Sequence, residues 1–338
     1  MRRPGIGKVA EVAGVSISTV SRVLKGAHGV HPLTESRVRD AMRELGYSPR
    51  QEASHRQRKP IAVVVPDVRN PFFGELIHWI GLAARDADYP LIITNAEIPD
   101  HGLEEIESLF RHRILSGVLL ATGAIEDDAL QLLSKAKIPA VVIARDLDTS
   151  LVSSVVTDDE LGGRLVAKHL LQCKPQRWAI LTETMRWRSS RDRHKGFTET
   201  LREHGIRDIS HWTSQESSVE GGYRACEHNL VPGPWPLAIF TTTDFFALGI
   251  LRFCREQRIE VPEQIQLVGY DGTILAEVAD PHLTTVRQQL QEMARAAVQL
   301  LLLHIEDPTG SPRKVILPPT FVVGESTKPK IDMLSELS

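Results

Sequence analysis

From residue 61 onward the sequence alternates between short, almost continuous apolar runs and longer amphipathic stretches. The apolar runs include IAVVV at 61–65, GVLLA at 117–121, AVVIA at 140–144, WAILT at 178–182 and LAIFTT at 237–242. Strands that are apolar on both faces and alternate with helices are typical of parallel sheets covered on both sides. The runs are too numerous for one such sheet. We therefore expect an α/β body of doubly wound parallel sheets, linked by right-handed crossovers, in two similar lobes with a cleft between them.

The segments that directly follow the apolar runs are candidates for ligand binding. In open α/β sheets, ligands bind beyond the carboxyl ends of the strands. Arginine and carboxylate side chains are frequent there, and they suit a polyhydroxy or anionic ligand through charge-assisted hydrogen bonds. The segments are 66–73, 145–148, 182–193, 241–245 and 269–273.

The first 60 residues differ from the rest in charge. They contain 12 lysines and arginines against 5 acidic residues, whereas the remainder carries 28 against 38. A basic segment attached to an acidic body indicates nucleic acid or another anionic partner. The alternative is a solvated basic tail with no partner.

The stretch VAEVAGVSISTVSRVL at 9–24 predicts two short helices joined at Gly14. Glycine tolerates the positive φ of a tight turn, and the small side chains of Ala10 and Ala13 permit close contact between the helices. Ser16 is a good N-cap for the second helix. The outward face of that helix is hydroxyl-rich and basic, which suits the major groove of DNA. We interpret the stretch as a DNA-reading helix-turn-helix; a helical hairpin without nucleic acid is the alternative.

A polar, basic segment between Pro49 and Pro60 is predicted to be a linker, with Pro49 suited to the first position of a short helix. We therefore expect a head, a hinge and a body whose two lobes are linked near residues 158, 287 and 318, an arrangement that suits closure around a ligand. The expected bounds are 1–48 for the head, 49–60 for the hinge and 61–338 for the body, with lobes at about 61–158 plus 288–317 and about 159–287 plus 318–330.

The chain resembles the lactose-repressor/galactose-repressor family of bacterial transcription factors. Besides 9–24, the resemblance rests on Thr34 and on segments that occur in the family's order. The resemblance implies a helix-turn-helix, a hinge helix and a two-lobed body like that of periplasmic sugar-binding proteins. It also implies a homodimer on a near-palindromic DNA operator and a small effector in the cleft. The segments are ELGYSP (44–49), PDVRNPFF (66–73), VTDDELGG (156–163), SRDRHKGF (190–197), TDFFALG (243–249), VGYDG (268–272) and HLTTVRQ (282–288).

The family pattern implies roles for residues of the head. Arg22 is expected to make a bidentate contact to guanine. The hinge leucine that wedges into the minor groove in this family is replaced here by Arg56, which is no apolar wedge but can enter a narrowed minor groove electrostatically. Gly5 and His31 stand where the family favours hydroxyl caps, so we expect weak starts for the first and third helices. The base-contacting residues are expected to be Ile17, Ser18 and Arg22, and the phosphate-contacting residues Ser16, Thr19 and Ser21.

The resemblance also implies an effector site. Arg193 and Asp271 match its arginine and its hydroxyl-accepting acid, and Ala144 stands where an acidic residue is common. Each of these positions has a structural alternative as a helix cap or a surface ion pair. Trp187 either stacks on a sugar or packs locally. The expected effector-binding residues are Asp67, Phe72, Phe73, Arg145, Arg193, Asp244 and Asp271.

We interpret the protein as a ligand-responsive, DNA-binding transcriptional repressor. A sugar or sugar derivative is the expected effector, with a purine or another non-sugar effector as the alternative. A small-molecule-binding protein would explain the lobes but not the basic head. An enzyme is not expected, because the sequence lacks G-x-G-x-x-G after the first strand, a P-loop, G-x-S-x-G and H-E-x-x-H.

The remaining sequence features concern cofactors and location. The three cysteines have no metal-ligand spacing, so we expect no metal, no cofactor and a reducing compartment. No secretory signal and no apolar run of the roughly 18 residues that a membrane span needs is present, so we expect a cytoplasmic protein without membrane contact.

Overall fold

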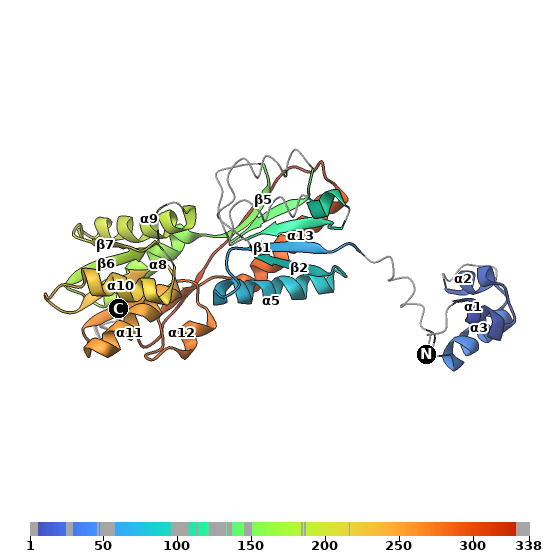
Figure 1. Ribbon diagram of the computed structural model, residues 1–338, viewed down its shortest axis with the longest axis horizontal. Coiled ribbons are helices and arrows are strands. Elements are labelled where there is room, and N and C mark those ends of the chain that lie inside the picture. The colour runs from blue at the N-terminus through green and yellow to red at the C-terminus, as the bar shows by residue number, and fades with distance from the viewer. Residues whose placement is uncertain are drawn as a thin grey trace, which may run out of the picture. The chain divides into compact units, whose positions relative to one another are not determined.

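The computed structural model of the chain divides into two compact units, Met1–Arg58 and Lys59–Ser338 (Figure 1). The expected class is confirmed: an all-α head and an α/β body of parallel sheets. The residues that the structure describes are 6–24, 30–45, 47, 58–95, 108–112, 114–121, 133, 137–144, 151–183, 185, 187–215 and 217–328.

The head is a three-helix unit made of α1 (Ile6–Ala13), α2 (Ile17–Leu24) and α3 (Pro32–Glu44). Gly14 has a φ of +63° in the turn between α1 and α2, as predicted. Ser16 caps α2 as predicted, because its Oγ accepts a hydrogen bond from Thr19 N at 3.1 Å. The helices enclose a small core of Val9, Ala10, Ala13, Val20, Val23, Val38, Ala41 and Tyr47.

The expected weak start of α3 is wrong. The imidazole Nδ1 of His31 accepts a hydrogen bond from Leu33 N at 3.3 Å, so the ring takes the place of a hydroxyl cap. Pro32 occupies the first helical position, where its missing N–H costs nothing. Gly5 lies outside the described residues.

The first lobe of the body is a six-stranded parallel sheet in the order β11-β5-β4-β3-β1-β2. Alternate residues of β1 point to opposite faces: Ile61 and Val63 join the core with α5 and α13, and Ala62 joins the core on the other side. Burial on both faces explains the continuous apolar runs. The bounds are β1 Ile61–Val65, α5 Pro71–Asp86, β2 Leu91–Asn95, β3 Gly117–Leu120, β4 Ala140–Ile143, β5 Ser153–Thr157, α13 Leu290–Glu306 and β11 Lys314–Leu317.

The second lobe is a four-stranded parallel sheet in the order β7-β6-β8-β9. Helices α8 and α9 cover one face, and α10 and α11 cover the other. A short antiparallel pair, β10 with β12, accompanies this lobe. The bounds are α8 Asp159–Gln172, β6 Arg177–Thr182, α9 Arg188–Glu203, β7 Ser210–Thr213, α10 Val219–Asn229, β8 Leu237–Thr241, α11 Asp244–Gln257, β9 Ile265–Val268, α12 Ile274–Val278, β10 Thr285–Arg287 and β12 Thr320–Val322.

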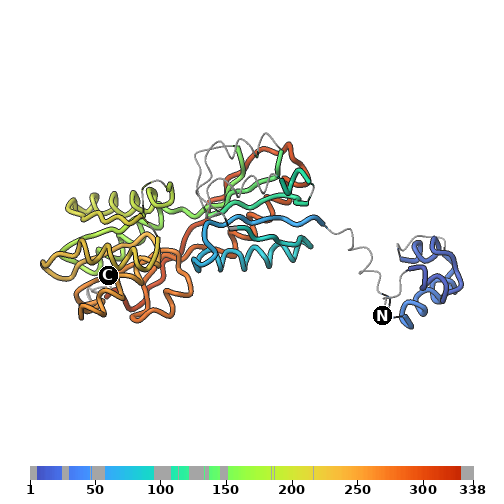
Figure 2. Tube along the Cα trace, in the orientation of Figure 1, coloured from blue at the N-terminus to red at the C-terminus, as the bar shows by residue number. Residues whose placement is uncertain are grey.

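The body chain passes between its two sheets after β5, after β10 and after β11, as the trace in Figure 2 shows. A binding site between the lobes is therefore bordered by several chain crossings. Among the described residues, no helix has the length and apolarity to cross a bilayer.

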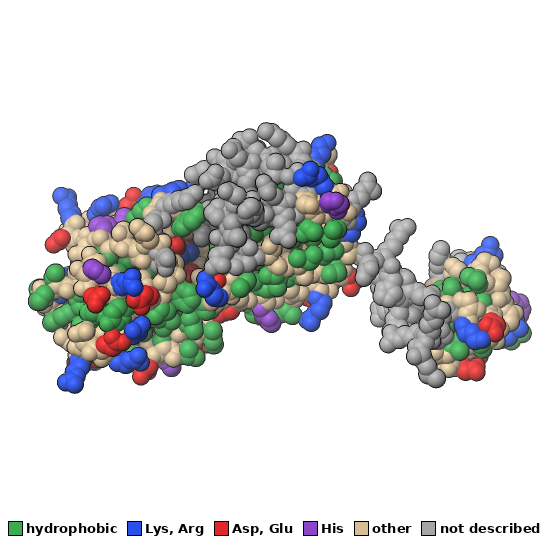
Figure 3. Space-filling model, viewed as in Figure 1, with side chains coloured by type: hydrophobic (Ala, Val, Ile, Leu, Met, Phe, Trp, Pro, Cys, Tyr) green, Lys and Arg blue, Asp and Glu red, His purple; other side chains and the backbone are tan. Residues whose placement is uncertain are grey.

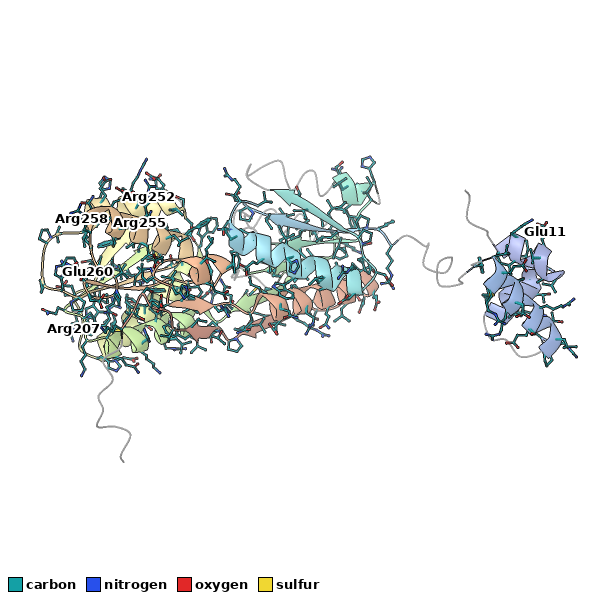
Figure 4. The ribbon with its side chains drawn as sticks, turned by 90° about the horizontal axis from the view of Figure 1, so that it is seen from below. Glu11, Arg207, Arg252, Arg255, Arg258 and Glu260 are labelled. Atoms are coloured by element: carbon teal, nitrogen blue, oxygen red, sulfur yellow. The ribbon has the colours of Figure 1, made fainter. Side chains whose placement is uncertain are left out.

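Exposed charges gather at the end of α11 and just beyond it, where Figure 4 labels Arg252, Arg255 and Arg258. Arg252 lies 3.0 Å from Glu256 and 3.6 Å from Glu220. Its charge is thus balanced locally, which is the ordinary arrangement of a solvated helix surface.

Helices α8 and α9 meet backbone to backbone. A Cβ at Gly163 would lie 2.2 Å from the carbonyl oxygen of Arg193, and one at Gly196 would lie 2.0 Å from the carbonyl oxygen of Glu160. Any side chain at either position must push the helices apart. This contact also sets the position of Arg193, which lies on α9.

The buried imidazole of His169, on α8, makes stability depend on pH. Its Nε2 lies 2.8 Å from Thr327 Oγ1, and burial lowers its pKa to about 4. In the unfolded chain histidine titrates near pH 6.5, so the unfolded state binds the extra proton as pH falls from about 6.5 to 4. The stability present at neutral pH is lost as the pH falls through this window. The loss is at most about 3–4 kcal/mol, and it is smaller where water screens the ring.

Urea unfolding at pH 7.5 and 4.5 measures this loss. The His169→Gln variant should lose less stability than the wild type between these two pH values. His228→Gln, at an exposed position on α10, is the matched control and should follow the wild type. An equal loss in His169→Gln and the wild type would contradict the assignment.

Candidate functional sites

The outward face of α2 presents a compact polar surface with one exposed apolar side chain. Ile17 is 56% exposed at the first position of the helix, and Ser18 and Arg22 are exposed beside it. Such a set suits a base-pair edge: an apolar contact for a thymine methyl group and a guanidinium fork for guanine.

Hydroxyl groups cluster at the amino end of α2. Ser16 Oγ lies 2.8 Å from both Ser18 Oγ and Thr19 Oγ1. Helix amino ends favour anions because their free N–H groups and dipole point outward. Thr19 and Ser21 are half-buried at the edges of this surface. The arrangement fits phosphate contacts by the hydroxyls and base contacts by the exposed residues. Arg56 lies outside the described residues.

A cavity of about 270 Å³ lies between the lobes, where residues that follow the carboxyl ends of strands in both sheets converge. Its position is the one expected for a ligand site in open parallel sheets. The cavity is lined by Pro66, Asp67, Asn70, Phe72, Phe73, Ala144, Glu183, Trp187, Ser189, Arg193, Ser217, Thr243, Phe245, Asp271 and Gln288.

The structure brings five of the predicted effector residues together on this cavity: Asp67, Phe72, Phe73, Arg193 and Asp271. Arg145 lies outside the described residues. The cavity is also lined by residues that were not expected from the sequence: Glu183, Ser189, Ser217, Thr243, Phe245 and Gln288. All but Ser217 and Gln288 lie in the strand-end segments 182–193 and 241–245. Position just after a strand is therefore the sequence signal that could have identified these residues as part of the site.

Asp244 corrects the sequence-based assignment, because its carboxylate does not line the cavity. It is buried at the start of α11, where Oδ1 accepts a hydrogen bond from Thr285 Oγ1 at 2.6 Å. Oδ2 accepts from Thr273 N at 3.0 Å and from Thr273 Oγ1 at 3.2 Å. Burial raises the pKa of Asp244 to about 6. Both oxygens are engaged in tying β10 and the loop after β9 to α11, so the residue is structural.

Arg193 is the centre of a buried ion network behind the cavity. Its Nε donates to Asp159 Oδ1 at 2.8 Å, and its Nη1 donates to Thr242 O at 2.7 Å. Nη1 also lies 3.5 Å from Asp271 Oδ1. The guanidinium carbon lies 3.8 Å from the ring centroid of Tyr270, whose hydroxyl donates to Asp159 at 2.8 Å. The arginine is thus held in one orientation.

Charges in this network depend on one another. Burial raises the pKa of Asp159 and raises that of Asp271 well above its usual range, although Arg193 opposes both shifts. Burial alone would lower the pKa of Arg193, but Asp159, Tyr270 and Asp271 together outweigh burial and raise that pKa. The guanidinium stays charged, and the carboxylates depend on it for their own charge.

A chain of hydrogen bonds links the cavity to the chain crossings. Gln288 Nε2 donates to Asp271 Oδ1 at 2.9 Å, and Thr157 Oγ1 donates to Gln288 Oε1 at 2.7 Å. Thr157 ends β5, and Gln288 lies between β10 and α13. Asp271 has a φ of +114°, a conformation that this network holds in place. A ligand that contacts Asp271 therefore acts on a group bonded to two crossing segments.

The cavity offers both donors and acceptors. The hydrogen bonds described above engage Nε and Nη1 of Arg193 and Oδ1 of Asp271, which leaves Arg193 Nη2 and Asp271 Oδ2 for a ligand. A guanidinium beside a carboxylate can bind adjacent hydroxyl groups. Within the described part of the chain, no three histidine, cysteine or acidic side chains gather as metal ligands.

Comparison with known proteins agrees with this architecture. Residues 6–50 match the family model described as bacterial regulatory proteins, lacI family, and residues 167–327 match the periplasmic binding protein-like domain. The HTH-type transcriptional regulator DegA of Bacillus subtilis is 32% identical over 95% of this chain and 97% of its own length.

Two solved structures extend the likeness to three dimensions. The lac repressor dimer bound to operator is 25% identical, with a TM-score of 0.76 over 96% of this chain and 99% of that one. A lacI family regulator of Enterococcus faecium with bound ribose is 29% identical, with a TM-score of 0.73 over 81% of this chain and 100% of that one. The chain therefore belongs to the lacI family of bacterial regulatory proteins.

Proposed function

We propose that this protein is a transcriptional repressor whose affinity for a DNA operator is controlled by a sugar or sugar derivative bound between its lobes. The observation that carries the proposal is the presence, in one chain, of a groove-reading helix face and a cavity with a paired arginine and aspartate. The E. faecium relative binds ribose, and the lac repressor binds operator DNA. The relative DegA is named a transcriptional regulator, and we propose that this chain likewise has no enzymatic activity.

The proposed mechanism links ligand contact to lobe geometry. A ligand in the cavity contacts residues of both lobes and competes for the hydrogen bonds of Asp271. Through Gln288 and Thr157 this changes the preferred arrangement of the chain crossings. The coupling between effector and operator is reciprocal and typically amounts to about 1–3 kcal/mol.

Replacing Arg22 tests the proposed DNA contact. We expect Arg22→Ala to relax the preference at one base pair in each half-site, at a cost of about 1–3 kcal/mol for the preferred base. A binding-site selection with randomised duplexes measures this. Arg39→Ala, on the exposed side of α3 and paired with Glu35, is the control and should keep the wild-type preference. An unchanged preference in Arg22→Ala would remove the residue from the base contacts.

We also propose that the protein is a homodimer, as the lac repressor is in its operator complex. A hollow of about 660 Å³ is lined by residues of α5 and α12, including Trp79 and Ile274. Ile274 and Val278 are 53% and 68% exposed, and Figure 3 shows apolar surface in the region of α12. The segment Phe73–Arg85, which lies within α5, contributes Gly74, Glu75, His78 and Trp79 to this hollow.

The Ile274→Asp variant should shift this dimer toward monomer, because Ile274 lines the hollow and a buried unpaired carboxylate opposes association. Sedimentation velocity at micromolar concentration measures the shift. Val231→Asp is the control, since Val231 is 62% exposed and does not line the hollow. A dimer of unchanged strength in Ile274→Asp would place the interface elsewhere.

A further inference from the structure

Among the described residues that line the cavity between the lobes, carboxylates outnumber cations. Asp67, Glu183 and Asp271 are acidic, and Arg193 is the one cation. Arg193 is already balanced, because Asp159 lies 2.8 Å from its Nε. The described part of the lining therefore presents more carboxyl groups than cations to a ligand.

The three acids differ in their own contacts. Asp67 is satisfied by Arg69, whose Nε and Nη2 lie 2.9 and 3.1 Å from its two carboxylate oxygens. Asp271 accepts from Gln288 and Arg193. Glu183, which follows β6 directly and is half-buried, has no hydrogen-bond or ion-pair partner in the described part of the chain. Its carboxylate is thus left to interact with whatever occupies the cavity.

Four aromatic side chains also line the cavity. Phe72 and Phe73 are buried and meet edge to face with their centroids 5.1 Å apart, and Trp187 and Phe245 line the cavity from the second lobe. The faces of such rings attract C–H groups of a sugar and ammonium groups, and their negative potential disfavours anions.

We propose that the cavity takes a carbohydrate without an acidic group, neutral or amine-bearing, and that Glu183 is the residue that excludes sugar phosphates and sugar acids. This rests on the proposed function, which leaves the charge of the effector open. A phosphate or carboxylate in the cavity would lie near the unpaired carboxylate of Glu183, and the one cation among the described lining residues, Arg193, is already charge-balanced by Asp159. A hydroxyl or ammonium group would instead donate to it.

The test is a thermal-shift screen of the full-length protein with matched compounds. The sets are ribose with ribose 5-phosphate, and glucose with glucosamine, glucose 6-phosphate and glucuronate, with cellobiose as a larger neutral sugar. A ligand that binds only the folded state raises the melting temperature. We expect the stabilising compounds to be neutral or amine-bearing, with at least 10-fold weaker binding of their matched anions.

Glu183→Gln keeps the shape of the side chain and removes its charge. This variant should bind the matched anion about 10-fold more tightly than the wild type, while affinity for the neutral sugar changes less than threefold. Glu203→Gln, at an exposed position on α9, should leave both affinities unchanged. In the wild type, raising NaCl from 0.05 to 0.5 M should reduce the preference for the neutral sugar over its matched anion, because salt screens the repulsion between Glu183 and the anion.

The outcomes separate this inference from the proposed function. The inference is overturned if a sugar phosphate or sugar acid raises the melting temperature most, or if Glu183→Gln leaves the preference for neutral sugars over their matched anions unchanged. In either case the carbohydrate effector stands. If none of the compounds shifts the melt while a selected operator is still bound, the carbohydrate effector is wrong and this inference falls with it.

Discussion

Replacing Arg193 with methionine is expected to lower the free energy of unfolding by about 3–5 kcal/mol and to abolish ligand binding. Methionine fills similar space but leaves Asp159 and Asp271 buried without their cation. It also removes the hydrogen bond to Thr242 O. Breaking a buried pair costs more than the pair itself contributes, because the remaining charge cannot regain its hydration. Urea unfolding and a thermal-shift titration measure the two effects.

A second substitution separates charge from packing. The double variant Arg193→Met with Asp159→Asn should recover part of the lost stability, because the amide carries no buried charge, and it should still fail to bind ligand. Arg202→Met, at an exposed position on the same helix, is the control, and its free energy of unfolding should lie within about 0.5 kcal/mol of the wild-type value. A loss of less than about 1 kcal/mol in Arg193→Met would contradict the buried network.

Replacing Gly196 with valine is expected to lower the free energy of unfolding by about 3 kcal/mol or more. A Cβ there would lie 2.0 Å from the carbonyl oxygen of Glu160, so α8 and α9 must separate. Overpacking against backbone is costly because neither helix can move without losing its own core contacts. Since Gly196 lies three residues after Arg193, ligand affinity should fall as well. Urea unfolding and ligand titration test both statements.

Gly81→Ala is the matched control, at a glycine within the helix α5. The nearest atom to its added Cβ, Leu91 Cδ2, is 3.8 Å away, an ordinary contact. Alanine restricts the unfolded chain and favours the helix, so this variant should gain about 0.5–1 kcal/mol. If both glycine substitutions had the same effect, close approach of α8 and α9 would not explain Gly196.

The sequence predicted the class of fold because its strongest signals are local. The runs at 61–65 and 237–241 are apolar on both faces, and each is a central strand with helices on both sides. Gly14 indicated a turn, and the turn has the positive φ that only glycine adopts readily. Family resemblance placed Arg193 and Asp271, and both line the cavity.

The remaining details depend on contacts between distant segments. Asp244 follows a strand just as a ligand-binding residue would, but Thr273 and Thr285 fold over it and occupy its oxygens. His31 caps α3 through a ring nitrogen, which composition does not reveal. Glu183 is an ordinary acidic residue in the sequence, and it becomes notable because it lines the cavity and has no ion-pair or hydrogen-bond partner among the described residues. No periodic pattern encodes these relations.

The central claim is that occupancy of the cavity controls the affinity of the head for its operator. Fluorescence anisotropy of a labelled, selected operator, titrated with the full-length protein in the presence and absence of the stabilising sugar, tests it directly. We predict specific binding that weakens steeply with salt, and an operator Kd that changes about 5- to 150-fold when the sugar is saturating. An operator Kd that is the same with and without the sugar would contradict the account.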